Sequence, residues 1–179
     1  MFDVMQASPA KAHRAAKLML GPVAAVLLLV LTFVGASSGA ADLPTKFDPS
    51  RDAAADISRA TSLANAQGKR VLVDVGGEWC AWCHVLDRFV AANADVRAFV
   101  HAHFIWVKVN FSPENRNEAV LSRWPPINGY PHLFVLDGSG RLLHSQDTGE
   151  LEAGNGYDKA RFRAFLERWA GSPVPVGRT

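Results

Sequence analysis

Two cysteines, Cys80 and Cys83, are the residues of this chain best suited to covalent chemistry, and they are the only cysteines among its 179 residues. They lie in the run WCAWCH at 79–84, where two residues separate them. This Cys-x-x-Cys spacing lets the two sulfurs cycle between a dithiol and a disulfide. With His84, the same run also matches the Cys-x-x-Cys-His sequence that attaches a c-type haem. The motif alone therefore leaves two chemistries open.

The first 40 residues have the features of an export segment. Basic residues at 11–17 precede an apolar stretch at 18–34, and the small residues at 38–40 fit signal-peptidase cleavage before Ala41. The apolar stretch could instead stay attached as an uncleaved membrane anchor. In both cases the positive-inside rule retains the basic residues in the cytoplasm and exports the remaining chain. We therefore predict a periplasmic location.

The exported part is long enough for one domain. Removing 40 of the 179 residues leaves 139, and we expect a domain at 41–170 followed by a flexible, proline-rich tail at 171–179. The 19 basic and 17 acidic residues of the whole chain reduce to 16 of each in this part, so its net charge is zero. Without a basic stripe to neutralise phosphates, no nucleic-acid partner is expected.

Export also changes how the cysteine pair is interpreted. In an oxidising compartment, two thiols usually form a structural disulfide. A disulfide stabilises a fold more when the loop that it closes is longer, and a bridge between Cys80 and Cys83 closes a very short loop. A structural role therefore explains this pair poorly, and a reactive role explains it better.

Hydrophobic periodicity predicts alternating helices and strands in the exported part. Helices are expected at 52–67, from the cysteine motif onward, at 95–102, at 113–124 and at 157–170. Strands are expected at 71–75, 104–111, 132–137 and 141–144, with the last two forming a hairpin. Loops are expected at 124–131 and 147–156, and an extended lead-in at 42–48. This order predicts an α/β fold with a mixed sheet covered by helices on both faces.

With this order of elements and a Trp-Cys-x-x-Cys motif after the first buried strand, the chain resembles the thioredoxin superfamily over nearly all of its exported part. It looks most like exported thioredoxin-like proteins with a WCxWC site. The further positions that match are Asp74, Trp79, Lys108 and the pair Tyr130-Pro131. The resemblance implies a thioredoxin-like fold and a cis peptide bond before Pro131, with this proline packed against the cysteine pair.

Two positions depart from the usual pattern of this superfamily. Ala81 and Trp82 stand between the cysteines in place of Gly and Pro, and His132 replaces the usual Thr or Val after the proline. These residues lie where the superfamily sets its redox properties, so the resemblance does not carry over a reduction potential or a direction of electron flow.

The expected catalytic residues follow from this arrangement. Cys80 precedes a helix N-terminus, where the helix dipole and free amides favour the thiolate, and we expect it to be the nucleophile. Cys83, within the first helical turn, is the expected resolving thiol. Asp74 lies in an apolar strand, where burial would raise its pKa and make it a proton acceptor for Cys83. Lys108 could pair with Asp74 or could be a solvated strand lysine.

The remaining site residues are expected to contact substrate or to modulate the cysteines. Pro131 would present its backbone to an extended substrate peptide. The residues expected to bind substrate are Trp79, Trp82, Tyr130 and His132, although either tryptophan could instead pack as core. An imidazolium at His84 or His132 would stabilise the Cys80 thiolate if it lay near the sulfurs, and the alternative is an ordinary surface histidine.

Three other functions are compatible with the cysteine motif. A c-type haem needs a second axial ligand, and all three methionines lie in the export segment, at 1, 5 and 19, although a histidine could substitute. Zinc or copper could bind to Cys80, Cys83, His84 and His132, but a proline over the cysteines argues against a metal. A chaperone-like binding domain would keep the fold without catalysis.

We therefore expect a periplasmic thiol–disulfide oxidoreductase. Reduction is favoured over oxidation because Trp79, Asp74 and Lys108 resemble the thioredoxin set and because no cation stands between the two cysteines. We expect no cofactor, because the redox-active disulfide Cys80–Cys83 carries the electrons, and we expect no metal. The expected partners are cysteine-containing exported proteins and a membrane thiol electron donor, and the stretch at 18–34 could attach the protein to the membrane.

Overall fold

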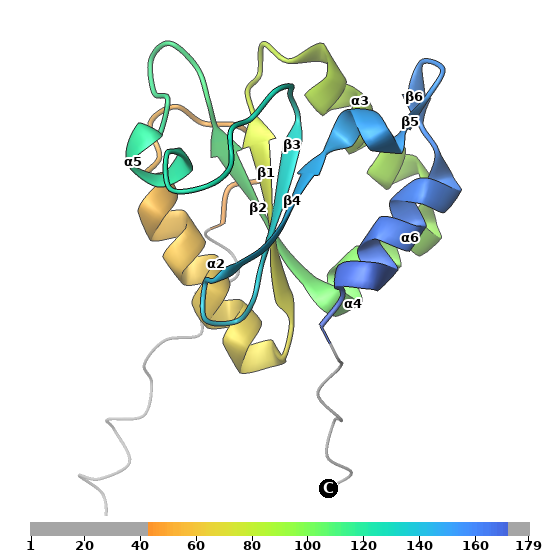
Figure 1. The fold of residues 1–179 in the computed structure, drawn as a ribbon, viewed down its shortest axis with the longest axis horizontal. Helices are drawn as coiled ribbons and strands as arrows, with labels where there is room; N and C mark the ends of the chain where they lie inside the picture. Colours follow the sequence, from red (N-terminus) through yellow and green to blue (C-terminus); the bar gives the residue numbers. More distant parts are fainter. Residues whose placement is uncertain (1–42, 172–179) are drawn as a thin grey trace, which may run out of the picture. The chain divides into compact units, whose positions relative to one another are not determined.

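A four-stranded sheet forms the centre of residues 43–171, which are the residues that the computed structural model describes (Figure 1). The strands are β1 (Arg70–Gly76), β2 (Phe104–Asn110), β3 (His132–Leu136) and β4 (Leu142–Asp147). Their order across the sheet is β2-β1-β3-β4. β1 runs parallel to β2 and antiparallel to β3, and β3 runs antiparallel to β4. The sheet is therefore mixed, as predicted.

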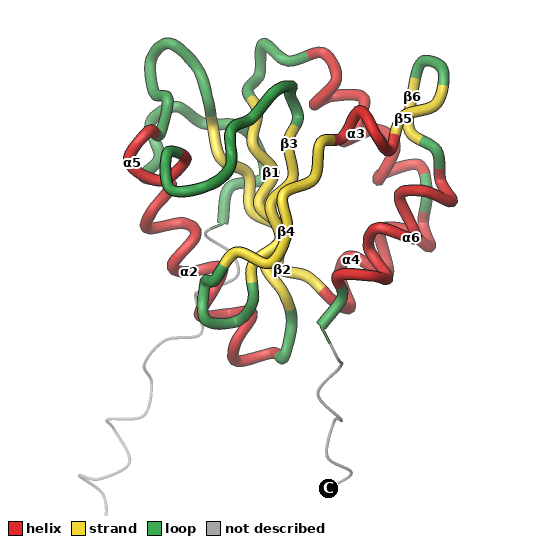
Figure 2. Tube along the Cα trace, viewed as in Figure 1, coloured by secondary structure: helices red, strands yellow, loops and turns green. Residues whose placement is uncertain are grey.

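Helices cover both faces of this sheet (Figures 1 and 2). One face carries α2 (Ala53–Gln67), and the other carries α3 (Ala81–Ala92), α4 (Ala94–His103) and α6 (Lys159–Trp169). Every residue of β1 after Arg70 is buried, because alternate side chains enter the two separate cores. The predicted α/β architecture is confirmed, with β1 and β3 enclosed at its centre.

The ends of α2 follow ordinary capping chemistry. The Asp52 carboxylate accepts hydrogen bonds from the backbone amides of Ala54 and Ala55, which satisfies two of the donors that a helix start leaves free. Gly68 ends the helix with φ of 64° in the left-handed region. Its amide then donates back to the carbonyl of Asn65. The predicted helix at 52–67 is thus confirmed to within one residue.

The prediction of a helix at 113–124 is wrong. The structure forms only α5 (Glu118–Leu121) there, after an irregular segment. Asparagine side chains supply the reason: Asn110 Nδ2 donates to the carbonyl of Asn115, and Asn117 Nδ2 donates to the carbonyl of Asn110. Such local bonds compete with helical backbone bonds, and Asn117 itself has a positive φ of 49°.

The segment at 147–156, predicted to be a loop, carries short regular elements. It holds the 3₁₀ helix η1 (Thr148–Leu151), the strand β5 (Glu152–Ala153) and the start of β6 (Gly156–Tyr157), which pairs with β5. The last helix, predicted from 157, begins two residues later because Asp158 caps it through the amide of Arg161.

Residues outside 43–171 include the predicted export segment at 1–40 and all of the tail at 171–179 except its first residue. Those predictions therefore lie outside the described residues. Between residues 43 and 171, no helix combines the length and the apolar character that a membrane crossing requires.

Replacing Gly68 by Ala should lower the free energy of unfolding by about 1 to 2 kcal/mol, since an L-residue is disfavoured in the left-handed region. Gly129→Ala is the matched control, because a methyl group there would meet no atom within 4 Å and the residue has no left-handed φ. Urea unfolding of the two variants and the wild type measures the difference. Equal losses in both variants would contradict a specific requirement at Gly68.

Candidate active site

Cys80 and Cys83 form a disulfide at the N-terminus of α3. Cys80 is the N-cap residue, and its sulfur accepts a hydrogen bond from the backbone amide of Cys83 at 3.1 Å. Both residues are buried, with 3% of Cys80 and none of Cys83 exposed. The first turn of α3 therefore directs a backbone donor at the sulfur of Cys80, as the sequence predicted for a helix N-terminus.

Gly76, at the end of β1, allows the sulfur of Cys83 to approach the sheet. A Cβ added to Gly76 would collide with Cys83 Sγ. Any larger residue would have to displace either the sulfur or the strand. The glycine between the buried strand and the motif is thus a packing requirement of the disulfide.

Asp74 is buried beneath this region, with 1% of the residue exposed. One carboxylate oxygen, Oδ2, accepts hydrogen bonds from Lys108 Nζ at 2.9 Å and from Trp106 Nε1 at 3.2 Å. The other oxygen, Oδ1, is buried without a hydrogen-bond partner. Burial raises the pKa of Asp74, and the charge of Lys108 opposes that rise. The predicted burial of Asp74 is confirmed, and of the two alternatives for Lys108 the structure shows the pairing with Asp74.

Lys108 bridges two carboxylates, because its ammonium also lies 2.8 Å from Oδ1 of Asp87 on α3. Burial acts to lower the pKa of Lys108, but the two carboxylates outweigh it and hold this pKa above its ordinary value. When both acids are ionised, the group of three carries one excess negative charge. Proton uptake by the more buried acid, Asp74, relieves that excess.

Aromatic residues surround the motif on its outer side. Trp79 is 56% exposed, and its indole nitrogen donates to the carbonyl of Phe111 at 2.8 Å. Its ring meets Tyr130 edge to face at 5.5 Å, and Tyr130 stacks on Phe111 at 5.1 Å. Trp82 is half-buried against Tyr157. Trp79 thus forms an exposed rim, whereas Trp82 belongs mainly to the core.

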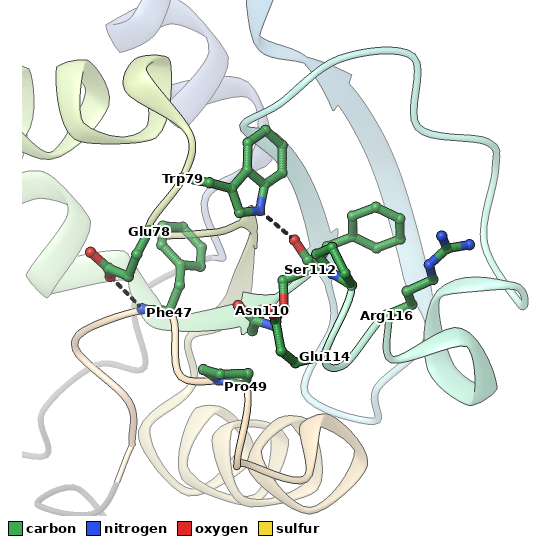
Figure 3. A pocket seen from close by; sticks show the side chains of 10 residues that line it. Phe47, Pro49, Glu78, Trp79, Asn110, Ser112, Glu114 and Arg116 are labelled. Carbon is green, nitrogen blue, oxygen red and sulfur yellow. Dashed lines mark hydrogen bonds between the residues drawn. The ribbon is translucent and has the colours of Figure 1, made fainter.

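A cleft of about 630 Å³ opens beside Trp79 (Figure 3). Its walls come from the lead-in segment at Phe47, from the motif and from the loop after β2, including Phe111. Glu78 and Glu114 also line it. The cleft therefore begins next to the residue that precedes Cys80, on the exposed side of the motif.

The peptide bond between Tyr130 and Pro131 is cis, as the resemblance implied. Pro131 is buried, and its carbonyl accepts a hydrogen bond from the hydroxyl of Thr148 at 2.6 Å. Tyr130 also packs against the buried cluster of Phe47, Cys80 and Cys83. The segment before β3 thus reaches the disulfide through Tyr130, and the packing of Pro131 against the cysteine pair stays a prediction.

His132 is not positioned to contact a substrate in this structure. Only 4% of the residue is exposed, and its Nε2 lies 2.8 Å from the hydroxyl of Ser145 on β4. Its ring lies 4.6 Å from that of Phe134, on the face of the sheet that carries α2. The expected role in substrate binding is therefore corrected to a buried packing role, because β3 is enclosed on both faces.

His84 lies at the motif but faces the loop before it. Its Nε2 is 2.9 Å from the carbonyl oxygen of Glu78 and 3.8 Å from that residue's carboxylate. The imidazole is thus held by Glu78, and any effect on the sulfurs would act through its charge.

Two residues of this site were missed from the sequence. Asp87 lies four residues after Cys83 on the same helix, and that spacing was a usable signal that both point the same way. Phe47 lies in the lead-in segment and packs on the disulfide. No local pattern marks it, because its contacts are made with residues far along the chain.

Between residues 43 and 171, no three or more His, Cys, Asp or Glu side chains come together in an arrangement that could hold a metal ion. Both sulfurs of the motif take part in the disulfide.

Comparison with known proteins places this geometry among related chains. A family model described as thioredoxin-like matches residues 52–138. The chain is similar to the thiol:disulfide interchange protein DsbD of Pseudoalteromonas atlantica, with 23% identity over 147 residues, 80% of this chain and 25% of that protein. It is 27% identical to the protein of the same name from Colwellia psychrerythraea over 95 residues, 52% of this chain and 16% of that one. The chain thus spans a quarter or less of these relatives.

Among solved structures, a disulphide isomerase from Xylella fastidiosa Temecula1 matches with a TM-score of 0.60 and 25% identity. The match covers 71% of this chain and 96% of that chain. The DsbD proteins are thus much longer than the part of them that matches, whereas almost the whole of the Xylella fastidiosa chain matches this one.

The buried His132 should make the fold sensitive to acid. Burial lowers the pKa of His132 below its ordinary value of 6.5, His144 acts in the same direction, and Asp147 opposes them. Since the unfolded chain then binds the proton more readily, stability should be present above pH 6.5 and be lost as the pH falls below it. His132→Gln should remove most of that pH dependence between about pH 7 and about pH 5.

Urea unfolding at several pH values measures this effect, and His101→Gln is the control because His101 is exposed on α4. The control should keep the wild-type pH dependence. An unchanged profile in His132→Gln would show that other groups cause the loss of stability in acid.

Proposed function

We propose that this protein is a thiol–disulfide oxidoreductase that acts through Cys80 and Cys83, and the match of residues 52–138 to a thioredoxin-like family model supports this proposal. The observation that carries the proposal is the disulfide at the N-terminus of α3. Asp74, a buried acid with one unpartnered oxygen, lies on β1 two residues before Gly76, which the sulfur of Cys83 approaches. The printed names of the relatives, thiol:disulfide interchange protein and disulphide isomerase, describe the same class of reaction. No cofactor beyond the cysteine pair is part of the proposal.

In the reducing direction, the first step is attack by the Cys80 thiolate on a sulfur of a substrate disulfide. A bond forms between Cys80 and the substrate, the substrate disulfide breaks, and the second substrate sulfur leaves as a thiolate. The amide of Cys83, which already donates to Cys80 Sγ, supports the charge on the attacking sulfur.

In the second step, Cys83 resolves the mixed disulfide. It loses its proton, attacks Cys80 Sγ and re-forms the internal disulfide, and the substrate sulfur leaves as a thiolate. Asp74 is the proposed proton acceptor, because its pKa is raised by burial and its Oδ1 has no other partner. Lys108 would limit that rise and keep the carboxylate able to release the proton again.

Substrate contact is proposed for the aromatic rim and the segment before β3. Trp79 offers the exposed apolar surface next to Cys80, and Tyr130 extends it. Pro131 would present backbone to an extended cysteine peptide. Trp82 would contribute only through its partly exposed edge. A substrate protein with exposed apolar residues around its own cysteines would fit this surface.

Reduction is the proposed direction of electron flow. The motif has Ala81 and Trp82 between its cysteines, and neither supplies a positive charge that would stabilise the reduced form and make the site strongly oxidising. After each turnover the disulfide must be reduced again, so a membrane thiol donor is proposed as the electron source. The proposed substrates are cysteine-containing exported proteins in the periplasm, and the stretch at 18–34 would attach the protein to the membrane if it is not cleaved.

Cys80→Ser should reduce the rate of insulin disulfide reduction by dithiothreitol to the uncatalysed background, because the nucleophile is lost. Cys83→Ser should keep the first step and accumulate a mixed disulfide between Cys80 and the substrate, visible on a non-reducing gel. Ala92→Ser is the matched control and should keep activity, since Ala92 is exposed at the C-terminal end of α3, the end opposite the cysteines. Wild-type activity in Cys80→Ser would disprove the proposed exchange reaction.

The reduction potential of the Cys80–Cys83 pair tests the direction separately. Equilibration with dithiothreitol or glutathione buffers should give a value near that of thioredoxin, about −270 mV. A value near about −120 mV, typical of a strong oxidant, would reverse the assignment to oxidation while leaving the exchange chemistry intact.

A further inference from the structure

Phe47 lies outside the family-matched residues 52–138 but packs directly on the redox pair. It is only 3% exposed, and it forms a buried cluster with Cys80 and Cys83. The lead-in segment before α2 therefore supplies one wall of the cysteine environment.

The ring of Phe47 shares the space above Gly76 with the sulfur of Cys83. A Cβ added to Gly76 would lie 3.1 Å from Phe47 Cζ and would also collide with Cys83 Sγ. Because Gly76 has no side chain, the end of β1 is covered by this phenyl ring instead. The ring thus lies beside the sulfur of Cys83, which is fully buried.

The same ring contacts the charged group beneath the cysteines. Lys108 Nζ lies 4.1 Å from the centroid of the Phe47 ring, in a cation–π arrangement. That ammonium also binds the carboxylates of Asp74 and Asp87. Phe47 is therefore in contact with both the sulfur pair and the cation that pairs with the proposed proton acceptor.

Hydrogen bonds hold the Phe47 segment at both ends. The amide of Phe47 donates to Oε1 of Glu78, in the loop before Cys80, at 3.1 Å (Figure 3). Further along, Asn115 Nδ2 donates to the carbonyls of Pro49 and Arg51 at 2.9 and 3.2 Å. The ring is thus fixed to the motif and to the loop after β2.

We propose that Phe47 is a positioning residue of the redox site, which excludes water from Cys80 and Cys83, holds Lys108 beside Asp74, and so favours the disulfide over the dithiol. The physical reason is that a thiolate requires hydration or polar donors, whereas an apolar ring supplies neither. The inference rests on the proposed exchange reaction at Cys80 and Cys83, and it adds a residue that acts on the equilibrium of that pair.

The test is the equilibrium constant between the cysteine pair and glutathione, measured on the full chain by acid quenching and thiol alkylation. In this reaction two glutathione thiols are oxidised to glutathione disulfide, and the protein disulfide takes up two electrons and two protons. Phe47→Ala should shift the constant about tenfold toward the dithiol, equivalent to about 30 mV. Phe47→Leu, which keeps apolar cover but loses the ring, should shift it about threefold.

Phe99→Ala is the matched control. Phe99 lies on α4 and also carries a cation over its ring, with Arg163 Cζ 4.1 Å from the centroid, but it packs in the core formed with α6 rather than in the cysteine cluster. The glutathione equilibrium constant of Phe99→Ala should equal that of the wild type. If circular dichroism shows that Phe47→Ala does not fold, the test uses Phe47→Leu, whose glutathione equilibrium constant is compared with those of the wild type and Phe99→Ala.

Unchanged constants in the folded Phe47 variants would overturn the inference, and so would an equal shift in Phe99→Ala. The outcome is separable from the proposed function, because the glutathione equilibrium requires no protein substrate. If the wild type does not catalyse insulin reduction, the proposed function alone is contradicted. If the wild type catalyses it but the Phe47 variants have an unchanged glutathione equilibrium constant, this inference alone is contradicted.

Discussion

The ion pair between Asp74 and Lys108 is the interaction on which the arrangement of this site depends. A carboxylate in the middle of a buried strand is costly unless a cation and hydrogen bonds compensate it. Here the cation comes from the neighbouring strand at the paired position, because the parallel register places Lys108 directly beside Asp74. A slip of one residue in β2 would turn Lys108 to the opposite face. The register of the central strands and the charge of the site are therefore coupled.

The second constraint is steric and lies at the end of the same strand. Gly76 allows Cys83 to lie close to the sheet, and the helix that carries Cys83 begins after a connection of only four residues, 77–80. This short connection directs the N-terminus of α3 at the sulfur of Cys80. The ion pair of Asp74 with Lys108 and the packing of the sulfur of Cys83 against Gly76 thus both depend on β1.

The sequence was sufficient for the elements whose signal is local. β1 is a continuous apolar run, and α2 has helical spacing with a capping Asp52 and a terminal Gly68, so both were predicted correctly. The helix at 113–124 failed because side chains such as Asn117 bind the backbone in a way that a periodicity count does not register. The cysteine pair could be named from its spacing, whereas Asp74 and Lys108 were named because they match positions of the thioredoxin superfamily.

Other parts of the site depend on contacts that no local pattern contains. His132 was expected near substrate because it follows the cis proline, but β3 is buried along its whole length, so a polar residue in it is enclosed. Phe47 reaches the motif across 31 residues, through the bond of its amide to Glu78. Its role depends on the space left by Gly76, and that space exists only after the chain has folded.

Asp74 and His132 show how the surroundings of a buried titratable group decide what it can do. They lie on opposite faces of the sheet, and burial favours the neutral form of each. His132 has the neutral hydroxyl of Ser145 as its hydrogen-bond partner, and the charge of Asp147 does not offset the effect of burial, so the pKa of His132 stays below its ordinary value. Asp74 has the ammonium of Lys108 at 2.9 Å, which makes both of its protonation states accessible. A group that must accept and return a proton needs such a partner, and Lys108 supplies it to Asp74 on the face that carries α3.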